Sequence, residues 1–202
     1  MANQTQRPDT ALHNTSHLMQ YHDLIESIVA AMDARDAYTA KHSDRVADMV
    51  LVLANALDLS EDETTLLHMA AHLHDIGKIA VPDSVLRKAG PLTSPEWEEM
   101  RRHPVTGYEI LRKVDDFKEI AVLVRHHHER WDGRGYPDGL RGADIPLGSR
   151  ILAVADSIDA MMSSRSYRPA MTGAACRREI ERNSGIMYDP CVAAAALEHW
   201  DE

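Results

Sequence analysis

The chain has 202 residues, of which 44% are hydrophobic, and it carries a formal charge of −10 at pH 7. This length fits one domain with a short leader, and the apolar fraction excludes a globally disordered chain. The negative charge argues against duplex nucleic acid as a partner, since non-specific duplex binding needs a basic surface. It does not argue against a small anionic substrate, because bound cations reverse the field locally.

Features of secreted and membrane proteins are missing from the sequence. No apolar run approaches the roughly 20 residues of a spanning helix, and the N-terminus lacks the apolar stretch of a signal peptide. The two cysteines, Cys176 and Cys191, fit free thiols in a reducing compartment. We therefore expect a cytoplasmic protein with no membrane partner.

The first predicted elements are two amphipathic helices. Residues 1–17 are expected to form a mobile leader, and residues 18–202 one domain. A helix is predicted over Leu18–Met32. A second helix carries apolar residues at helical spacing from Val46, and His42 lies one turn earlier on its inward face.

The third predicted helix begins at a capping box formed by Ser60 and Glu63. His74 lies on its apolar stripe, one turn after Ala70. Gly77, with a proline soon after it, is expected to end or bend this helix.

Histidines follow at the ends of the next helices. Ser94 is predicted to cap a helix that stops near His103. A later helix places His128 near the centre of its apolar stripe and His127 at the edge, whereas His126 points the opposite way.

The C-terminal third begins with a glycine- and proline-rich segment, Asp132–Gly148, which is expected to be a structured loop. A helix resumes at about Arg150 and is apolar almost all round, which predicts a buried central helix. Asp156 and Asp159 lie inside it, and a last helix opens at Asp189. No set of alternating strands is found, so the predicted fold class is all-α, a helical bundle.

Several ionisable residues fall on predicted buried faces. They are His42, His74, Asp75, His103, His127, His128 and Asp156. Such groups are unfavourable in a core unless something pairs them, and imidazoles with carboxylates can bind divalent metal ions. Seven ligands are too many for one open metal ion, so they favour a dinuclear site. The mixture of ligands suits iron or manganese.

Two segments carry a family resemblance. His74-Asp75-Ile76-Gly77-Lys78 resembles the signature of the HD phosphohydrolase superfamily, and residues 127–137 resemble the longer signature of the HD-GYP family. Supporting matches run from about Asp36 to Leu197. The resemblance implies an HD-domain bundle in which the segment Asp132–Gly148 is the GYP loop, named after Gly135-Tyr136-Pro137, and residues 18–202 are the catalytic domain.

The resemblance also implies roles for individual residues. The seven residues above match the family's metal ligands, and Asp75 would bridge two metal ions. Lys78 matches a lysine that contacts the scissile phosphate. Tyr136, Arg165 and Arg168 match positions that contact the dinucleotide.

The implied activity is that of a cyclic di-GMP phosphodiesterase. A metal-bridging hydroxide would cleave the substrate to linear pGpG, which some family members cleave further to GMP. Members with a third metal ion carry a glutamate where this chain has Tyr38, so we expect two. A homodimer or a diguanylate-cyclase-type partner would fit a signalling enzyme.

Other residues are given structural roles. Glu129 and Asp132 are expected to hold the GYP loop. For Asp159 two roles are equally favoured, support of a metal ligand and helix packing. His22 and His126 are expected to be exposed bystanders. His68 and His72 are read as structural histidines.

Three alternative functions stay open. The chain could be a catalytically silent cyclic-dinucleotide sensor or protein-docking module of the same fold. It could be an HD hydrolase for mononucleotides, although the GYP loop and the arginine pair speak against this. A di-iron site could also carry out redox chemistry.

Overall fold

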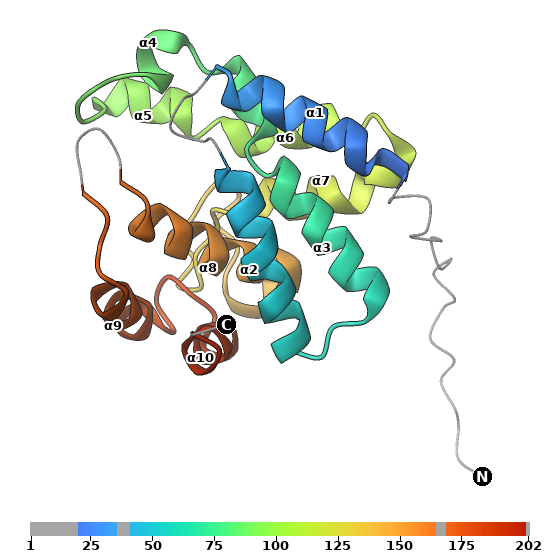
Figure 1. The fold of residues 1–202 in the computed structure, drawn as a ribbon. Coiled ribbons are helices and arrows are strands. Elements are labelled where there is room, and N and C mark those ends of the chain that lie inside the picture. The colour runs from blue at the N-terminus through green and yellow to red at the C-terminus, as the bar shows by residue number, and fades with distance from the viewer. Residues whose placement is uncertain (1–19, 36–40, 165–168, 201–202) are drawn as a thin grey trace.

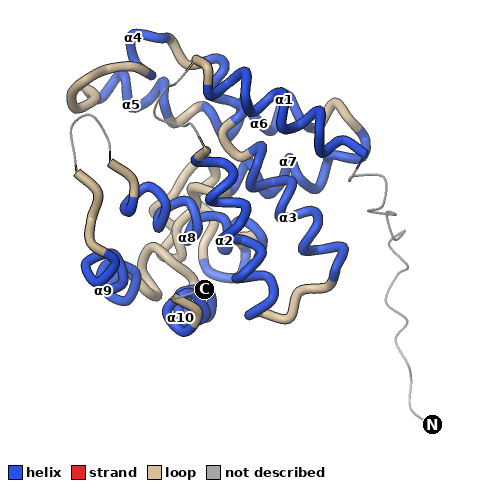
Figure 2. Tube along the Cα trace, viewed as in Figure 1, coloured by secondary structure: helices blue, strands red, loops and turns tan. Residues whose placement is uncertain are grey.

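The regular elements of the computed structural model are helices throughout the described residues, which are 20–35, 41–164 and 169–200 (Figure 1). The α-helices are α1 (His22–Asp33), α2 (His42–Ala56), α3 (Glu61–Leu73), α4 (Asp83–Leu86), α5 (Ser94–Met100), α6 (His103–Leu111), α7 (Lys118–His126), α8 (Leu147–Met162), α9 (Gly173–Asn183) and α10 (Pro190–Glu198). Three short 3₁₀ helices are η2 (Ile76–Ala80), η3 (Asp115–Phe117) and η4 (Gly142–Asp144). Within those ranges loops join the helices and no strand forms (Figure 2), which confirms the all-α prediction.

Helix ends follow local hydrogen bonds. The capping box before α3 is present: the Ser60 backbone N–H donates to Glu63 Oε2 at 2.9 Å, and the Glu63 N–H donates to Ser60 Oγ at 3.3 Å. The predicted cap at Ser94 was wrong by one residue. The N-cap of α5 is Thr93. Its backbone N–H and its hydroxyl both donate to the Glu96 carboxylate, at 2.7 and 2.8 Å.

The helices α8 and α1 begin at other residues than the sequence predicted. The helix expected to resume near Arg150 begins at Leu147, directly after Pro146, so the predicted loop is shorter than expected. Proline fits there because its fixed φ suits the residue that leads into a helix. The predicted start of the first helix at Leu18 lies outside the described residues, and α1 begins at His22.

The apolar interior consists of two clusters that share α3. One cluster joins α3 to α2, α8, α9 and α10, and includes Leu67 and Ala71 of α3. The other joins α3 to α1, α6 and α7, and includes Met69 and Leu73. In Figure 1, α3 accordingly lies between α2 and the group formed by α1 and α7. The end of α3, where His74 and Asp75 follow, is therefore fixed by packing on two sides.

A glycine allows the next segment to approach α6 closely. A Cβ added at Gly77 in η2 would lie 1.9 Å from the backbone oxygen of His103 and 2.6 Å from the nitrogen of Gly107. Only glycine permits this approach without a backbone shift. The contact brings the His74-Asp75 pair to the beginning of α6.

Among the residues described, no helix has the length and apolar character that crossing a membrane requires.

Candidate metal centre

The seven predicted ligands all lie in described segments, and most stand at helix ends. The ligands are His42 at the start of α2, His74 and Asp75 just after α3, His103 at the start of α6, His127 and His128 just after α7, and Asp156 within α8. His42, His74, Asp75, His103 and His127 are buried, whereas His128 and Asp156 are half-buried. The structure brings all seven into one cluster.

The cluster divides into two groups. In each group, one potential ligand atom per residue lies within 4.8 Å of the others: His42, His74 and Asp75 form one group, and His103, His127 and His128 form the other. Asp156 joins the first group, with Oδ1 3.3 Å from His42 Nε2.

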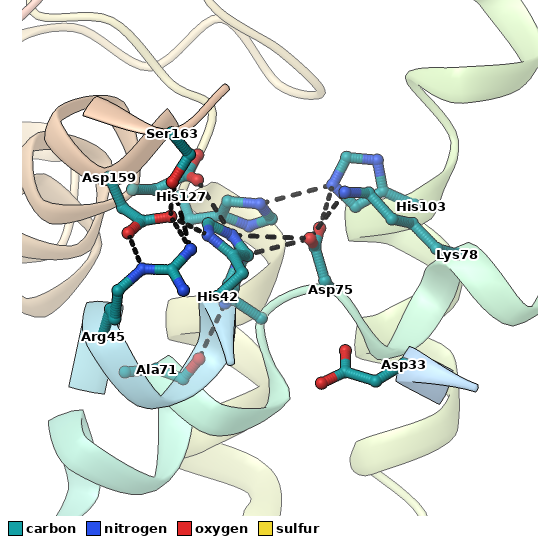
Figure 3. A network of polar contacts seen from close by, with 12 residues as sticks. Asp33, His42, Arg45, Ala71, Asp75, Lys78, His103, His127, Asp159 and Ser163 are labelled. Atoms are coloured by element: carbon teal, nitrogen blue, oxygen red, sulfur yellow. Dashed lines mark hydrogen bonds and ion pairs between the residues drawn. The ribbon is translucent and has the colours of Figure 1, made fainter. Parts of the chain in front are cut away.

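Asp75 lies between the two groups. Its Oδ2 is 3.4 Å from His74 Nε2, and its Oδ1 is 3.5 Å from His103 Nε2. Figure 3 shows the carboxylate with His42 on one side and His103 with Lys78 on the other. The two oxygens of one side chain therefore face different groups.

Backbone carbonyls orient three of the imidazoles. The Nδ1 atoms of His74, His103 and His127 lie 2.7, 2.8 and 2.6 Å from the carbonyl oxygens of Ala71, Met100 and Val124. A carbonyl only accepts hydrogen bonds, so Nδ1 carries the proton and a neutral ring has a lone pair at Nε2.

Two of these lone pairs face each other. His103 Nε2 and His127 Nε2 are 3.3 Å apart. Two lone pairs cannot form a hydrogen bond, whereas a cation between them satisfies both. This arrangement fits metal ions.

The protonation states of three imidazoles also suit metal binding. Burial lowers the pKa of His103 to about 3 and the pKa of His128 to about 4, and it holds the pKa of His127 well below its ordinary value. These rings are neutral near pH 7, which is the form that binds metal.

The carboxylates stay ionised. Burial alone would raise the pKa of Asp75, but the positive charge of Lys78 is the largest of the causes that hold it well below its ordinary value. Burial would also raise the pKa of Asp156, yet the hydrogen bond and the positive charge of His42, together with smaller contributions from other groups, hold it well below its ordinary value. The centre therefore combines the neutral imidazoles of His103, His127 and His128 with anionic oxygens, a donor set that suits divalent transition metals.

Asp159 contacts the Nδ1 side of His42, away from the Nε2 atom that faces the metal centre. Its Oδ2 lies 2.6 Å from His42 Nδ1, and its Oδ1 accepts a hydrogen bond from Arg45 Nε at 2.5 Å. Burial opposes protonation of His42, but hydrogen bonds to Asp156 and Asp159 raise the pKa of its imidazole to about 10. A positive charge, from a proton or a metal ion, is thus favoured here. Of the two interpretations of Asp159, the contact favours ligand support.

Lys78 stands beside the centre. Its Nζ lies 2.5 Å from Asp75 Oδ2, and its side chain is 24% exposed. The residue follows Asp75 by one turn of η2, so the sequence spacing dictates this contact. A cation is thereby held at the edge of the cluster, where an anionic ligand could reach it.

The GYP loop is held by acidic side chains, as expected. Buried Glu129 accepts the N–H groups of Asp138 and Gly139 at Oε1, at 2.7 and 3.0 Å. Asp132 accepts the N–H of Arg134 at 3.1 Å. These contacts hold the loop beside α7.

Tyr136 of the loop reaches the metal centre. Its ring centroid lies 4.9 Å from that of His128, and the guanidinium of Arg101 lies 5.3 Å from the Tyr136 ring centroid. Sequence reasoning did not single out Arg101. It directly precedes the Arg102-His103 pair, but only the folded loop brings Tyr136 against it.

The prediction that His126 is a bystander was wrong. Its Nε2 lies 3.0 Å from Asp138 Oδ2, and Arg125 Nε donates to the same carboxylate oxygen at 2.7 Å. His126 does point away from the centre, as periodicity indicated, but the loop folds back over that face. Sequence periodicity carries no signal for such a return.

Three residues with predicted roles fall outside the described segments. They are Tyr38, Arg165 and Arg168. The predicted leader, residues 1–17, also lies outside them.

Comparison with known proteins agrees with this architecture. The family model of the HD domain matches residues 23–192. A 3′3′-cGAMP-specific phosphodiesterase of Vibrio cholerae is 41% identical over 185 residues, which cover 89% of this chain and 35% of that protein. The cyclic di-GMP phosphodiesterase response regulator RpfG of Xanthomonas campestris is 44% identical over 175 residues, covering 85% of this chain and 46% of that protein.

Solved structures share the fold. A cyclic GMP-AMP-specific phosphodiesterase of V. cholerae superposes with a TM-score of 0.69 at 20% identity, over 89% of this chain and 48% of that one. An HD-GYP-type protein of Bdellovibrio bacteriovorus gives 0.66 at 18% identity, over 89% and 60%. The chain spans less than half of the length of the curated relatives named above. With its helical architecture and the HD model across most of its length, the chain belongs to the HD domain family, in the HD-GYP group that its motifs resemble.

Proposed function

We propose that this chain is a metal-dependent phosphodiesterase that hydrolyses a cyclic dinucleotide, with cyclic di-GMP as substrate and linear pGpG as first product. The observation that carries the proposal is the position of Asp75. Its two oxygens face two separate groups of imidazoles, at 3.4 and 3.5 Å from the nearest nitrogen in each. A carboxylate in that position is suited to bridging two metal ions.

The ligands divide between two metal positions. His42, His74 and Asp156 would hold one ion, and His103, His127 and His128 the other, with Asp75 shared. Iron and manganese suit these donors. When bound, the two ions lower the pKa of water and stabilise negative charge on a phosphoryl group.

Side chains around the metal centre position the substrate. Lys78 places a cation beside Asp75, where it would bind a non-bridging oxygen of the scissile phosphate and stabilise its growing charge. Tyr136, backed by the Arg101 guanidinium, would place its ring against the dinucleotide. Arg165 and Arg168 would grip the second phosphate or a guanine edge, since guanidinium groups suit both.

The relatives support a cyclic dinucleotide as the substrate class. Their names include both cyclic di-GMP and 3′3′-cGAMP phosphodiesterases. We favour cyclic di-GMP, with further cleavage of pGpG to GMP as a slow second reaction at a site of two metal ions. The whole protein, in which residues 18–202 act as the catalytic unit, would work in the cytoplasm, as a homodimer or with a diguanylate-cyclase-type partner.

A silent sensor is the second candidate, and a substrate panel separates the two. The panel consists of cyclic di-GMP, 3′3′-cGAMP and a set of nucleoside monophosphates and triphosphates, each incubated with metal-loaded protein. Linear product from cyclic di-GMP at the highest kcat/KM supports the proposal. Tight binding of cyclic di-GMP without any product would favour the sensor, and turnover of mononucleotides alone would favour a different hydrolase.

A further inference from the structure

Three histidines outside the metal centre form a second cluster between α1 and α3. His68 and His72 are one turn apart on α3, with ring centroids 4.8 Å apart. The ring of His22, from α1, lies 6.0 Å from His68 and 5.6 Å from His72. One nitrogen from each ring lies within 4.8 Å of the others. His22 was expected to be an exposed bystander, and this expectation was wrong because α1 packs along α3.

Two nitrogens of this cluster lack hydrogen-bond partners among the described residues. They are Nδ1 of His68 and Nδ1 of His72, and both atoms are buried. A buried polar atom without a partner destabilises the fold, so a ligand that satisfies it is favoured. Burial is also the main cause that lowers the pKa of His68, so this ring is neutral and has a lone pair to offer near pH 7.

Two carboxylates lie near the rings of His22 and His72 without pairing closely. Asp44 Oδ1 lies 3.7 Å from His72 Nδ1, and Glu26 Oε1 lies 3.6 Å from His22 Nδ1. Both distances exceed those of good hydrogen bonds. The carboxylates nevertheless supply negative charge next to the imidazoles, which would offset the charge of a dication.

We propose that His22, His68 and His72 form a second metal site, which takes one Zn²⁺ or a similar borderline cation. Two histidines four residues apart on one helix, with a third from another element, are a common donor arrangement for zinc. Three imidazoles leave a fourth position for water or for Asp44. A bound cation would join α1 to α3, the helix that leads directly to His74.

The test counts zinc on the full chain and on variants. Wild-type protein, His22→Gln and His68→Gln are saturated with Zn²⁺, freed of excess metal and assayed by elemental analysis. His199→Gln, in the residue after α10, is the matched control. We expect both cluster variants to hold one equivalent fewer than wild type, and the control to equal wild type. Because every protein keeps the residues of the main metal centre, the difference isolates the second site.

A stability measurement makes the test independent of that count. Added Zn²⁺ should raise the Tm of wild type and of His199→Gln by several degrees more than that of His22→Gln. His22 lies half-buried on the outer helix, so its variant should fold even where His68→Gln does not. Equal zinc content and equal Tm shifts in wild type and His22→Gln would overturn the proposal, whatever the protein hydrolyses.

Discussion

His42 and Asp159 are joined through imidazole Nδ1 and carboxylate Oδ2, which lie 2.6 Å apart. Asp159 comes from α8 and is itself fixed by Arg45 of α2, so the contact ties the two helices together. It also turns His42 Nε2 toward Asp156, 3.3 Å away. Asp159 thus acts on the metal centre through His42 and has no need to touch a metal ion.

Replacing Asp159 tests this indirect role. Asp159→Asn keeps the shape of the side chain but removes the charge that orients and polarises His42. We expect metal affinity to fall about 10–100-fold, as is typical when such a supporting carboxylate is lost. Competition with a chelator measures the affinity, and Asp58→Asn, at an exposed position, is the control. Unchanged affinity in Asp159→Asn would show that Asp159 serves only packing.

The shared position of Asp75 distinguishes it from the other ligands. We expect Asp75→Ala to lose both metal ions and all turnover, because each ion loses a ligand. His103→Ala should weaken one ion selectively and leave about one per chain. Elemental analysis of both variants, after the same preparation, measures the difference. Near-normal activity in Asp75→Ala or in His74→Ala would refute the assignment of the site.

Lys78 is expected to act on the substrate and not on metal retention. Lys78→Ala removes the cation 2.5 Å from Asp75 Oδ2 but no metal ligand. We expect metal content to stay near that of wild type while kcat falls about 10²–10³-fold, the usual cost of losing one group that stabilises transition-state charge. Loss of metal together with full activity in the remaining loaded fraction would contradict this role.

Gly77 offers a test of how the fold positions the ligands. A Cβ at this position would meet the His103 backbone oxygen at 1.9 Å, whereas a Cβ at Gly90 would meet nothing within 4 Å. We expect Gly77→Ala to lower the free energy of unfolding by at least about 2 kcal/mol, because backbone atoms must move apart. Gly90→Ala should change it by less than about 0.5 kcal/mol. Denaturant titration of both variants makes the comparison, and equal stabilities would contradict the close contact.

Acid should weaken the attachment of the GYP loop. The hydrogen bond from Arg125 is the main cause that lowers the pKa of Asp138 to about 2, from an ordinary value of 3.8. The folded-state pKa is depressed, so the pairing stabilises the protein above about pH 4 and is lost as the pH falls toward 2. We expect the difference in unfolding free energy between wild type and Asp138→Asn to be constant at higher pH and to shrink across that window. A difference that stays constant down to pH 2 would exclude the pairing.

Helical periodicity predicted much of the fold and most of the site. It placed His42 and His74 on inward faces because each lies one turn from an apolar residue of its own helix. It could not assign His126 or His22, because their partners come from a returning loop and from a neighbouring helix. For the same reason periodicity could not decide whether Asp159 supports a metal ligand or serves packing. It shows that a side chain faces inward but not which group it contacts there. The resemblance supplied the bridging role of Asp75, which spacing alone could not have shown.

The direct test of a phosphodiesterase with two metal ions is hydrolysis of cyclic di-GMP by protein purified without oxygen, with metal content assayed on the same sample. We expect linear pGpG from protein that holds about two iron or manganese ions in the main centre. No product from protein loaded with both ions would contradict it.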